Sequence, residues 1–150
     1  MKRDFLILRL ATVGPVGYLI APGTLSTLLT LPLVYLLNQW SGNNAMLYFF
    51  ILILLTCCAF YIIQHALLMI KRHEDPDEIV LDDIIGSLLT FWMIPLTTQS
   101  LIIGFILFRC LAIPKWGLIK GSEELPGAWG VIGDDIIAAL TTNIILRFLF

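Results

Sequence analysis

The chain has 150 residues, of which 59% are hydrophobic and 13% are charged, and its formal net charge is −2. A soluble domain is nearer half apolar and about a quarter charged, so a single water-soluble core does not account for this composition. The small net charge and the lack of a basic stripe argue against nucleic acid as a partner. The mean hydropathy of +0.93 predicts that lipid is the solvent and that the protein is a polytopic membrane protein.

The N-terminal stretch MKRDFLILRLATVGPVGYLIAPG resembles a signal peptide only superficially. Arg9 interrupts its apolar run, Gly14 and Pro15 break it, and no clear small-residue cleavage site follows. We therefore expect an interfacial or half-inserted helix at this end of the chain.

Five apolar segments follow. A bilayer core of about 30 Å requires about 20 helical residues, and the second segment is long enough to cross with some tilt. The expected fold is all-α, with about four to five transmembrane helices in a single membrane-embedded domain that spans residues 1–150. The predicted spans are 25–38, 45–70, 79–96, 100–113 and 132–149.

The connections between these segments differ in charge. Residues 41–44 and 97–99 carry none, whereas the N-terminus, 71–78 and 114–130 carry seven of the nine lysines and arginines, and Arg109 lies near the last of these segments. With five spans, the three charged segments lie on one face. The positive-inside rule makes that face cytoplasmic and places the C-terminus outside.

Two aspartate pairs, Asp82-Asp83 and Asp134-Asp135, stand at the starts of two spans that are entered from the charged face. One such aspartate is commonly a helix cap, because a helix N-terminus favours negative charge. Two pairs at one face favour a shared site, because ionised carboxylates at membrane depth are costly and normally face an interior or a water-filled cavity. Carboxylate oxygens suit Mg²⁺, Mn²⁺ or Ca²⁺, so all four residues are candidate metal ligands.

The same face carries groups that suit an anion. Arg109 and Lys115 are candidate phosphate ligands, and the backbone N–H groups around Gly23 and Thr24 start a helix. His65 or an aspartate is the candidate general base. The alternatives are membrane-surface anchors for the two basic residues, a turn and helix cap at 23–24, and a hydrogen-bonded interior histidine. A phosphate beside an acidic metal site predicts phosphoryl chemistry. A divalent-cation transporter is a weaker hypothesis, because all four acids lie at one face.

Four stretches resemble the bacterial phosphatidylglycerophosphatase A family, in the same order along the chain: APGTLSTLLTLPLVYLL, QHALLMIKRHEDPDEIVLDDIIGSLLT, GFILFRCLAIPKWGLI and GVIGDDIIAAL. The resemblance implies a Mg²⁺-dependent phosphatase of the bacterial inner membrane. Its substrate would be phosphatidylglycerophosphate, hydrolysed at the cytoplasmic face to phosphatidylglycerol. The implied partners are this phospholipid and the membrane.

The resemblance extends to individual positions. Those that match the family pattern are Gly23, Thr24, His65, Asp82, Arg109, Lys115, Asp134 and Asp135. Those that depart are Ser26 and Thr27 for Gly-Ser, Asp83 for Glu, Ala112 for Asp and Trp116 for Pro. A lost carboxylate near a metal often costs 10–100-fold or more in affinity or activity. The alternative function is therefore a degenerate family member that binds phospholipid or a membrane partner without turnover.

Overall fold

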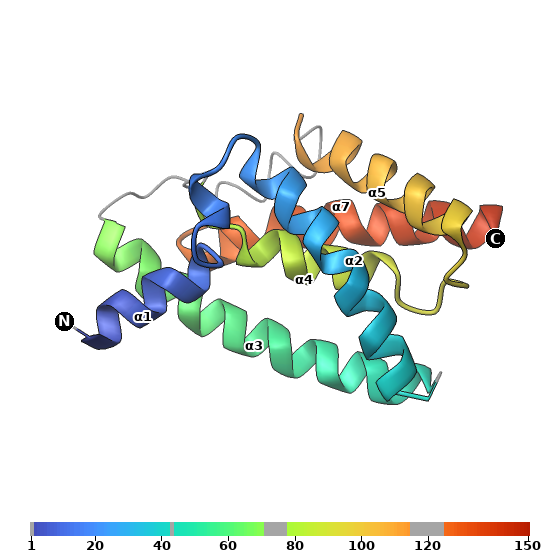
Figure 1. Ribbon diagram of the computed structural model, residues 1–150, viewed down its shortest axis with the longest axis horizontal. Coiled ribbons are helices and arrows are strands. Elements are labelled where there is room, and N and C mark those ends of the chain that lie inside the picture. The colour runs from blue at the N-terminus through green and yellow to red at the C-terminus, as the bar shows by residue number, and fades with distance from the viewer. Residues whose placement is uncertain (1, 43, 71–77, 115–124) are drawn as a thin grey trace.

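The computed structural model describes residues 2–42, 44–70, 78–114 and 125–150 (Figure 1). These residues form six α-helices, one 3₁₀ turn and no strand, which confirms the all-α prediction. In chain order the elements are α1 (Lys2–Ala11), η1 (Val16–Tyr18), α2 (Pro22–Trp40), α3 (Ala45–Ile70), α4 (Leu81–Thr90), α5 (Thr98–Ala112) and α7 (Ala128–Leu149).

Four of the predicted apolar segments correspond to helices. α3 coincides with the predicted 45–70, whereas α2 and α5 begin three and two residues before the predicted 25–38 and 100–113. α7 begins at Ala128, four residues before the predicted 132–149. Asp134 and Asp135 therefore lie in the second turn of α7, and the prediction that they occupy its first turn or so is corrected.

The predicted span 79–96 is wrong in length, because the helix α4 contains only ten residues. After Thr90 the chain turns, Met93 takes a φ of +60°, and Pro95 has no N–H to continue a helix. Ten helical residues rise about 15 Å, which is half of the hydrocarbon thickness of a bilayer. α4 is thus a half-length helix inside the bundle.

Side chains from two other helices satisfy the carbonyl groups at the end of α4. Asn143 Nδ2 of α7 donates to the Thr90 carbonyl at 2.9 Å and to the Trp92 carbonyl at 2.8 Å. Arg147 Nε donates to Asn143 Oδ1 at 2.7 Å, and Tyr48 Oη of α3 donates to a carbonyl in the last turn of α4 at 2.8 Å. Because unpaired carbonyls in an apolar interior are costly, these bonds allow α4 to end there.

α4 lies at the centre of the bundle and packs against α7, α2 and α3 (Figure 1). The N-terminus and the start of α4 lie on the left in Figure 1. The C-terminus and the connections α2–α3 and α4–α5 lie on the right. α1 packs on α3 through Ile7 and Ala11, whereas its Phe5 and Leu6 are exposed. Its placement at a membrane interface stays a prediction.

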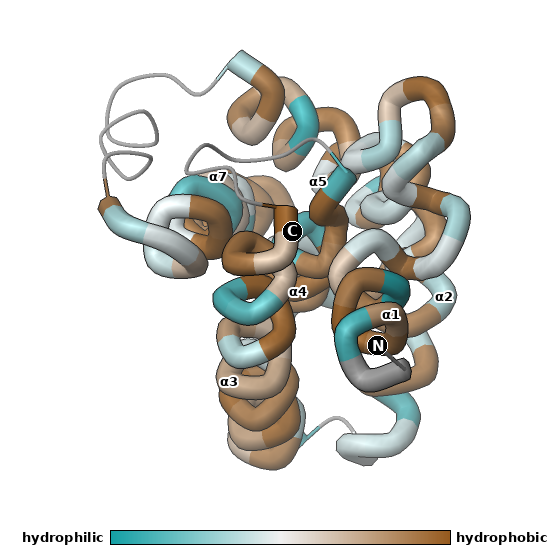
Figure 2. The backbone as a smooth tube through the Cα atoms, turned by 90° about the vertical axis from the view of Figure 1, so that its left-hand side faces the viewer, coloured by the Kyte–Doolittle hydropathy of each residue, from teal (hydrophilic) through white to brown (hydrophobic). Residues whose placement is uncertain are grey.

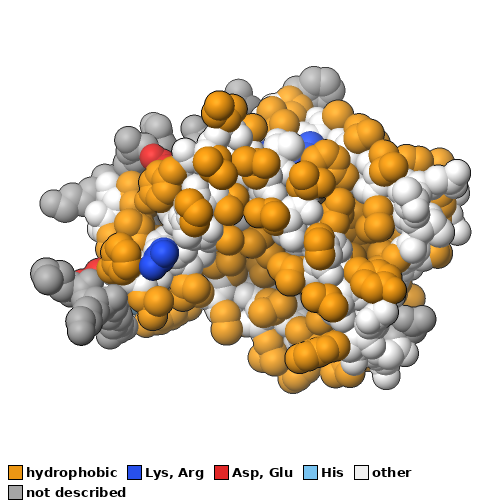
Figure 3. Space-filling model, viewed as in Figure 1, with side chains coloured by type: hydrophobic (Ala, Val, Ile, Leu, Met, Phe, Trp, Pro, Cys, Tyr) orange, Lys and Arg blue, Asp and Glu red, His pale blue; other side chains and the backbone are white. Residues whose placement is uncertain are grey.

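Hydrophobic side chains cover most of the face seen in Figure 3, and α3 is hydrophobic along most of its length in Figure 2. Such a large exposed apolar surface is unusual for a soluble monomer. Among the described residues, α3 and α7 are long and apolar enough to cross a bilayer, and α5 is a shorter apolar helix. These two helices have the length and hydropathy of membrane spans, whereas the total of four to five spans stays a prediction.

Candidate functional site

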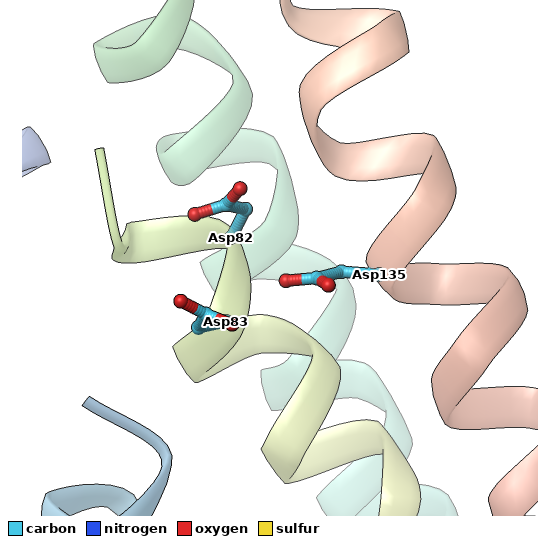
Figure 4. A group of neighbouring side chains, drawn as sticks. All are labelled: Asp82, Asp83 and Asp135. Carbon is cyan, nitrogen blue, oxygen red and sulfur yellow. The ribbon is translucent and has the colours of Figure 1, made fainter. Parts of the chain in front are cut away.

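Three buried carboxylates from two helices converge where the start of α4 meets α7. Asp82 and Asp83 belong to the first turn of α4, and Asp135 reaches toward them from α7 (Figure 4). Each offers an oxygen that lies within 4.8 Å of an oxygen of the other two. The structure therefore brings together three of the four acids that the sequence singled out.

A close helix approach makes this convergence possible. Gly86 lies one turn after the two aspartates of α4, and a Cβ built there would lie 2.8 Å from the Phe108 ring of α5. The same Cβ would lie 3.3 Å from Cβ of Asp135. Because only glycine fits this contact, α5 and α7 both pack against the first turns of α4.

Asp134 is buried but does not belong to this group of three. Its Oδ1 accepts a hydrogen bond from the backbone N–H of Asp135 at 2.9 Å. Adjacent residues on a helix point about 100° apart, so one member of the pair faces α4 and the other takes a different direction. A metal-ligand role for Asp134 stays a prediction.

Arg109, in the last turn of α5, lies beside the acids. Its Nη1 forms an ion pair with Asp83 Oδ1 at 2.5 Å and lies 3.5 Å from Thr27 Oγ1. The side chains of this ion pair are only 14% and 12% exposed. Its Nε is buried, and no acceptor for it is found among the described residues. The guanidinium therefore has donor capacity that its contacts with Asp83 and Thr27 do not use.

The start of α2 forms the third side of the site. A Cβ built on Gly23 would lie 2.5 Å from Asp83 Oδ2 and 2.8 Å from Arg109 Nη2, so the backbone of α2 lies directly against the ion pair. The N–H of Thr24 donates to the Ala21 carbonyl at 3.1 Å. The prediction of free N–H groups around Gly23 and Thr24 is thus corrected at Thr24, whose amide is already bonded within the turn.

The sequence missed two hydroxyl residues of α2 as site residues. Ser26 Oγ lies 3.2 Å from Asp83 Oδ2 and 2.7 Å from the Gly23 carbonyl, and Thr27 Oγ1 is the second neighbour of Arg109. Both residues are buried. In the sequence they stand out only as departures from the Gly-Ser of the family pattern. The signal that would have found them is their spacing, since they follow Gly23 by three and four residues and so share its helix face.

The other predicted site residues lie elsewhere. His65 is half-buried on α3, where its Nδ1 lies 2.8 Å from the Tyr61 carbonyl, and among the described residues it has no hydrogen bond to the acids. Lys115 and Trp116 lie outside the described residues. Ala112, the last residue of α5, is buried in the apolar core one turn after Arg109.

The three clustered carboxylates of Asp82, Asp83 and Asp135 fit a small divalent cation. Mg²⁺ binds oxygens at about 2.0–2.1 Å in an octahedron, so its ligands lie at most about 4.2 Å apart. Small side-chain adjustments bring oxygens that lie within 4.8 Å of one another to that spacing. Three ionised aspartates and one arginine carry a formal charge of −2, which one divalent cation balances. The arginine and the start of α2 add groups that suit a phosphate.

The model of one protein family, described as phosphatidylglycerophosphatase A, matches residues 9–150, which is nearly the whole chain. Searches of curated proteins and of solved structures returned no match. The family implies phosphatidylglycerophosphatase activity and a phospholipid substrate. On the extent of this match, the chain belongs to the phosphatidylglycerophosphatase A family.

Proposed function

We propose that the chain is a Mg²⁺-dependent phosphatase that converts phosphatidylglycerophosphate to phosphatidylglycerol at the cytoplasmic face of the bacterial inner membrane. The observation that carries this proposal is that three buried carboxylates, the Arg109 guanidinium of α5 and the start of α2 lie side by side. In the reaction, a water oxygen bonds to phosphorus and the phosphorus–oxygen bond to the glycerol breaks. The leaving oxygen takes a proton, and inorganic phosphate is released.

The chain's own residues bind and orient the phosphate. Arg109 offers a planar set of donors, and its Nε is one that Asp83 does not use. Because Gly23 has no side chain, the Asp83–Arg109 ion pair lies directly against the backbone at the start of α2, which places the guanidinium beside that end of the helix. Ser26 and Thr27 fix the Asp83 carboxylate and the arginine at that end of α2. Lys115 remains a predicted phosphate ligand.

The metal would be held by Asp82, Asp83 and Asp135, with Asp134 orienting the backbone of Asp135. Mg²⁺ held there would supply Lewis-acid chemistry to the phosphate and to the attacking water. A carboxylate of the group accepts a proton from the attacking water. His65 is the weaker candidate base, because its ring nitrogen is directed to a carbonyl of its own helix.

The proposed topology has five passes, with the acidic site on the cytoplasmic side. Figure 1 supports it, because the two uncharged connections and the C-terminus lie on the side opposite to the start of α4. The short α4 and residues 91–97 together form one pass, with the carbonyl groups at the break satisfied by Asn143. This topology places the C-terminus outside the cytoplasm. Alkaline phosphatase is active only outside the cytoplasm, so alkaline phosphatase fused to the C-terminus is expected to be active. The topology would be contradicted if that fusion were inactive while a C-terminal fusion to a protein that fluoresces only in the cytoplasm were fluorescent.

A second candidate function is lipid binding without turnover. Two observations favour it: Ala112 places a buried methyl group where the family pattern has a carboxylate, and Arg109 already neutralises Asp83. A protein of this kind would bind phosphatidylglycerophosphate but release no phosphate. Restoring the carboxylate with Ala112→Asp would then be expected to create activity.

Phosphate release separates the two functions. Purified protein in mixed micelles is given phosphatidylglycerophosphate with and without Mg²⁺, beside phosphatidic acid and a soluble phosphate monoester. The phosphatase predicts metal-dependent release from the first substrate and its loss in Asp82→Asn. Folded protein that binds the lipid but releases nothing from any substrate would refute the phosphatase and favour the degenerate member.

A further inference from the structure

An apolar cavity of about 620 Å³ lies between α2, α3 and α4, outside the acidic site. None of its twelve lining residues carries a charge, and they include Leu36 and Trp40 of α2, Cys58 and Ala59 of α3, and Leu81 and Ile84 of α4. Sites for small ligands commonly measure about 300–1,000 Å³. The volume therefore fits a small apolar ligand or one hydrocarbon chain.

The cavity and the acidic site share α4. Residues 81, 84, 85 and 88 line the cavity and follow the spacing of one helix face. Asp82, Asp83 and Gly86 lie toward α7, α5 and α2. Leu81 and Asp82 are adjacent, so their Cα atoms are about 3.8 Å apart. The apolar cavity therefore begins one residue from the carboxylates.

We propose that this cavity, here called the acyl groove, holds one acyl chain of the phospholipid whose phosphate enters the acidic site. The proposal rests on the proposed function. In a phospholipid the chain and the phosphate are joined through one glycerol, so their binding sites must adjoin, as the two faces of α4 do. A second protein chain is a poorer occupant, because a stable interface buries about 800 Å² on each partner and a single cavity of this size does not supply that area.

The experiment measures how hydrolysis depends on chain length. Phosphatidylglycerophosphates with short chains of increasing length are used below their micelle concentrations, with the deacylated headgroup phosphate as the reference. Transfer of one methylene from water is worth about 0.8 kcal/mol, which is about fourfold in kcat/KM. Wild-type protein is expected to gain up to about fourfold for each methylene added, until the groove is full.

Two adjacent cysteines of α3 supply a matched pair of variants. Cys57 and Cys58 are both exposed, but only Cys58 lines the groove. Cys58→Phe is expected to fill the groove and flatten the chain-length dependence, while hydrolysis of the deacylated reference stays unchanged. Cys57→Phe is expected to keep the wild-type dependence. Leu36→Trp, at an exposed groove position on α2, provides a second filling variant if Cys58→Phe does not fold.

The outcomes separate the groove from the enzyme. Hydrolysis that depends on chain length equally in Cys57→Phe and Cys58→Phe would overturn the groove and leave the phosphatase standing. A change of oligomeric state in Cys58→Phe alone would also overturn it, and would make the cavity an interface between copies. Absence of hydrolysis in wild-type protein would refute the phosphatase alone. In that case, photo-crosslinking with a diazirine-bearing acyl chain decides, and crosslinks outside the groove residues would overturn the proposal.

Discussion

Gly23→Ala tests whether the contact between α2 and the Asp83–Arg109 ion pair positions the reacting groups. The new Cβ would lie 2.5 Å from Asp83 Oδ2, whereas ordinary van der Waals contacts begin at 3.4 Å. The carboxylate oxygen must therefore move by about 0.9 Å, or α2 must shift by the same amount. A misplacement of about 1 Å costs about 100-fold in rate. We expect kcat for phosphatidylglycerophosphate to fall by about that factor.

The fold should tolerate this change. Gly23 lies in the first turn of α2, and the atoms that its new Cβ would meet are the ends of the Asp83 and Arg109 side chains, which can shift without unfolding the helix. The assay is phosphate release at saturating Mg²⁺ and lipid, with thermal unfolding measured on the same preparation. We expect the midpoint of unfolding to stay close to that of the wild-type protein while kcat falls.

Gly104→Ala is the matched control, because its Cβ would also lie 2.5 Å from a side-chain atom, in this case on the Phe91 ring. It introduces a similar steric overlap in the apolar core, away from the acids. We expect it to lower the unfolding midpoint and to leave kcat of the folded protein close to the wild-type value. If Gly23→Ala keeps at least half of the wild-type kcat, the close approach of α2 has no catalytic role and the reasoning is refuted.

Three further predictions concern other contacts. Asp135→Asn should reduce the rate of phosphate release by about 100-fold or more and weaken Mg²⁺ binding measured by calorimetry. Asp134→Asn should reduce the rate by about tenfold at most. Equal losses in the two variants would show that both residues are ligands. Arg109→Lys should lower kcat/KM about tenfold or more, because an ammonium cannot replace the planar fork, and unchanged kinetics would remove the arginine from phosphate binding. Asn143→Leu leaves two carbonyls without their amide donor and should lower the free energy of unfolding in detergent by about 2–4 kcal/mol. The control Thr141→Val, at an exposed position, should lower it by about a few tenths of a kcal/mol. A smaller loss in Asn143→Leu would mean that water reaches the end of α4.

The sequence predicts elements whose signal is local. The sequence predicts both ends of α3 to the residue, because its apolar run is continuous between polar connections. The predicted 79–96 is longer than α4, because the apolar run continues through 91–96 although the helix ends at Thr90. Its end depends on Tyr48 and Asn143, which lie 40 and more than 50 residues away in the chain. No local pattern contains that information.

The candidate site divides in the same way. Carboxylates in an apolar chain are conspicuous, so the residue type alone identifies Asp82, Asp83 and Asp135 as candidates. The choice between Asp134 and Asp135 depends on the rotation of α7 against α4, which the close contact at Gly86 fixes. Ser26 gave no such signal, because a serine in the first turns of a helix is ordinary. Its spacing from Gly23 places it on the same helix face, but its contact with Asp83 follows from the approach of α2 to α4.

The shortness of α4 links these features. A helix of full length that began at Leu81 would extend its apolar end through the bundle and displace Asn143 and the Trp92 segment from their contacts. Because α4 stops at Thr90, its carbonyl end is held by α7 at the same time as its amino end carries two of the three carboxylates. Both ends of α4 thus contact α7. Because α4 has only ten residues, these two contacts fix how far along α7 Asp82 and Asp83 lie relative to Asp135. To bind a small cation, the ligand oxygens must lie within a few tenths of an ångström of fixed positions. A short helix that is fixed at both ends holds its carboxylates at such positions better than a long helix that slides or tilts with the bilayer.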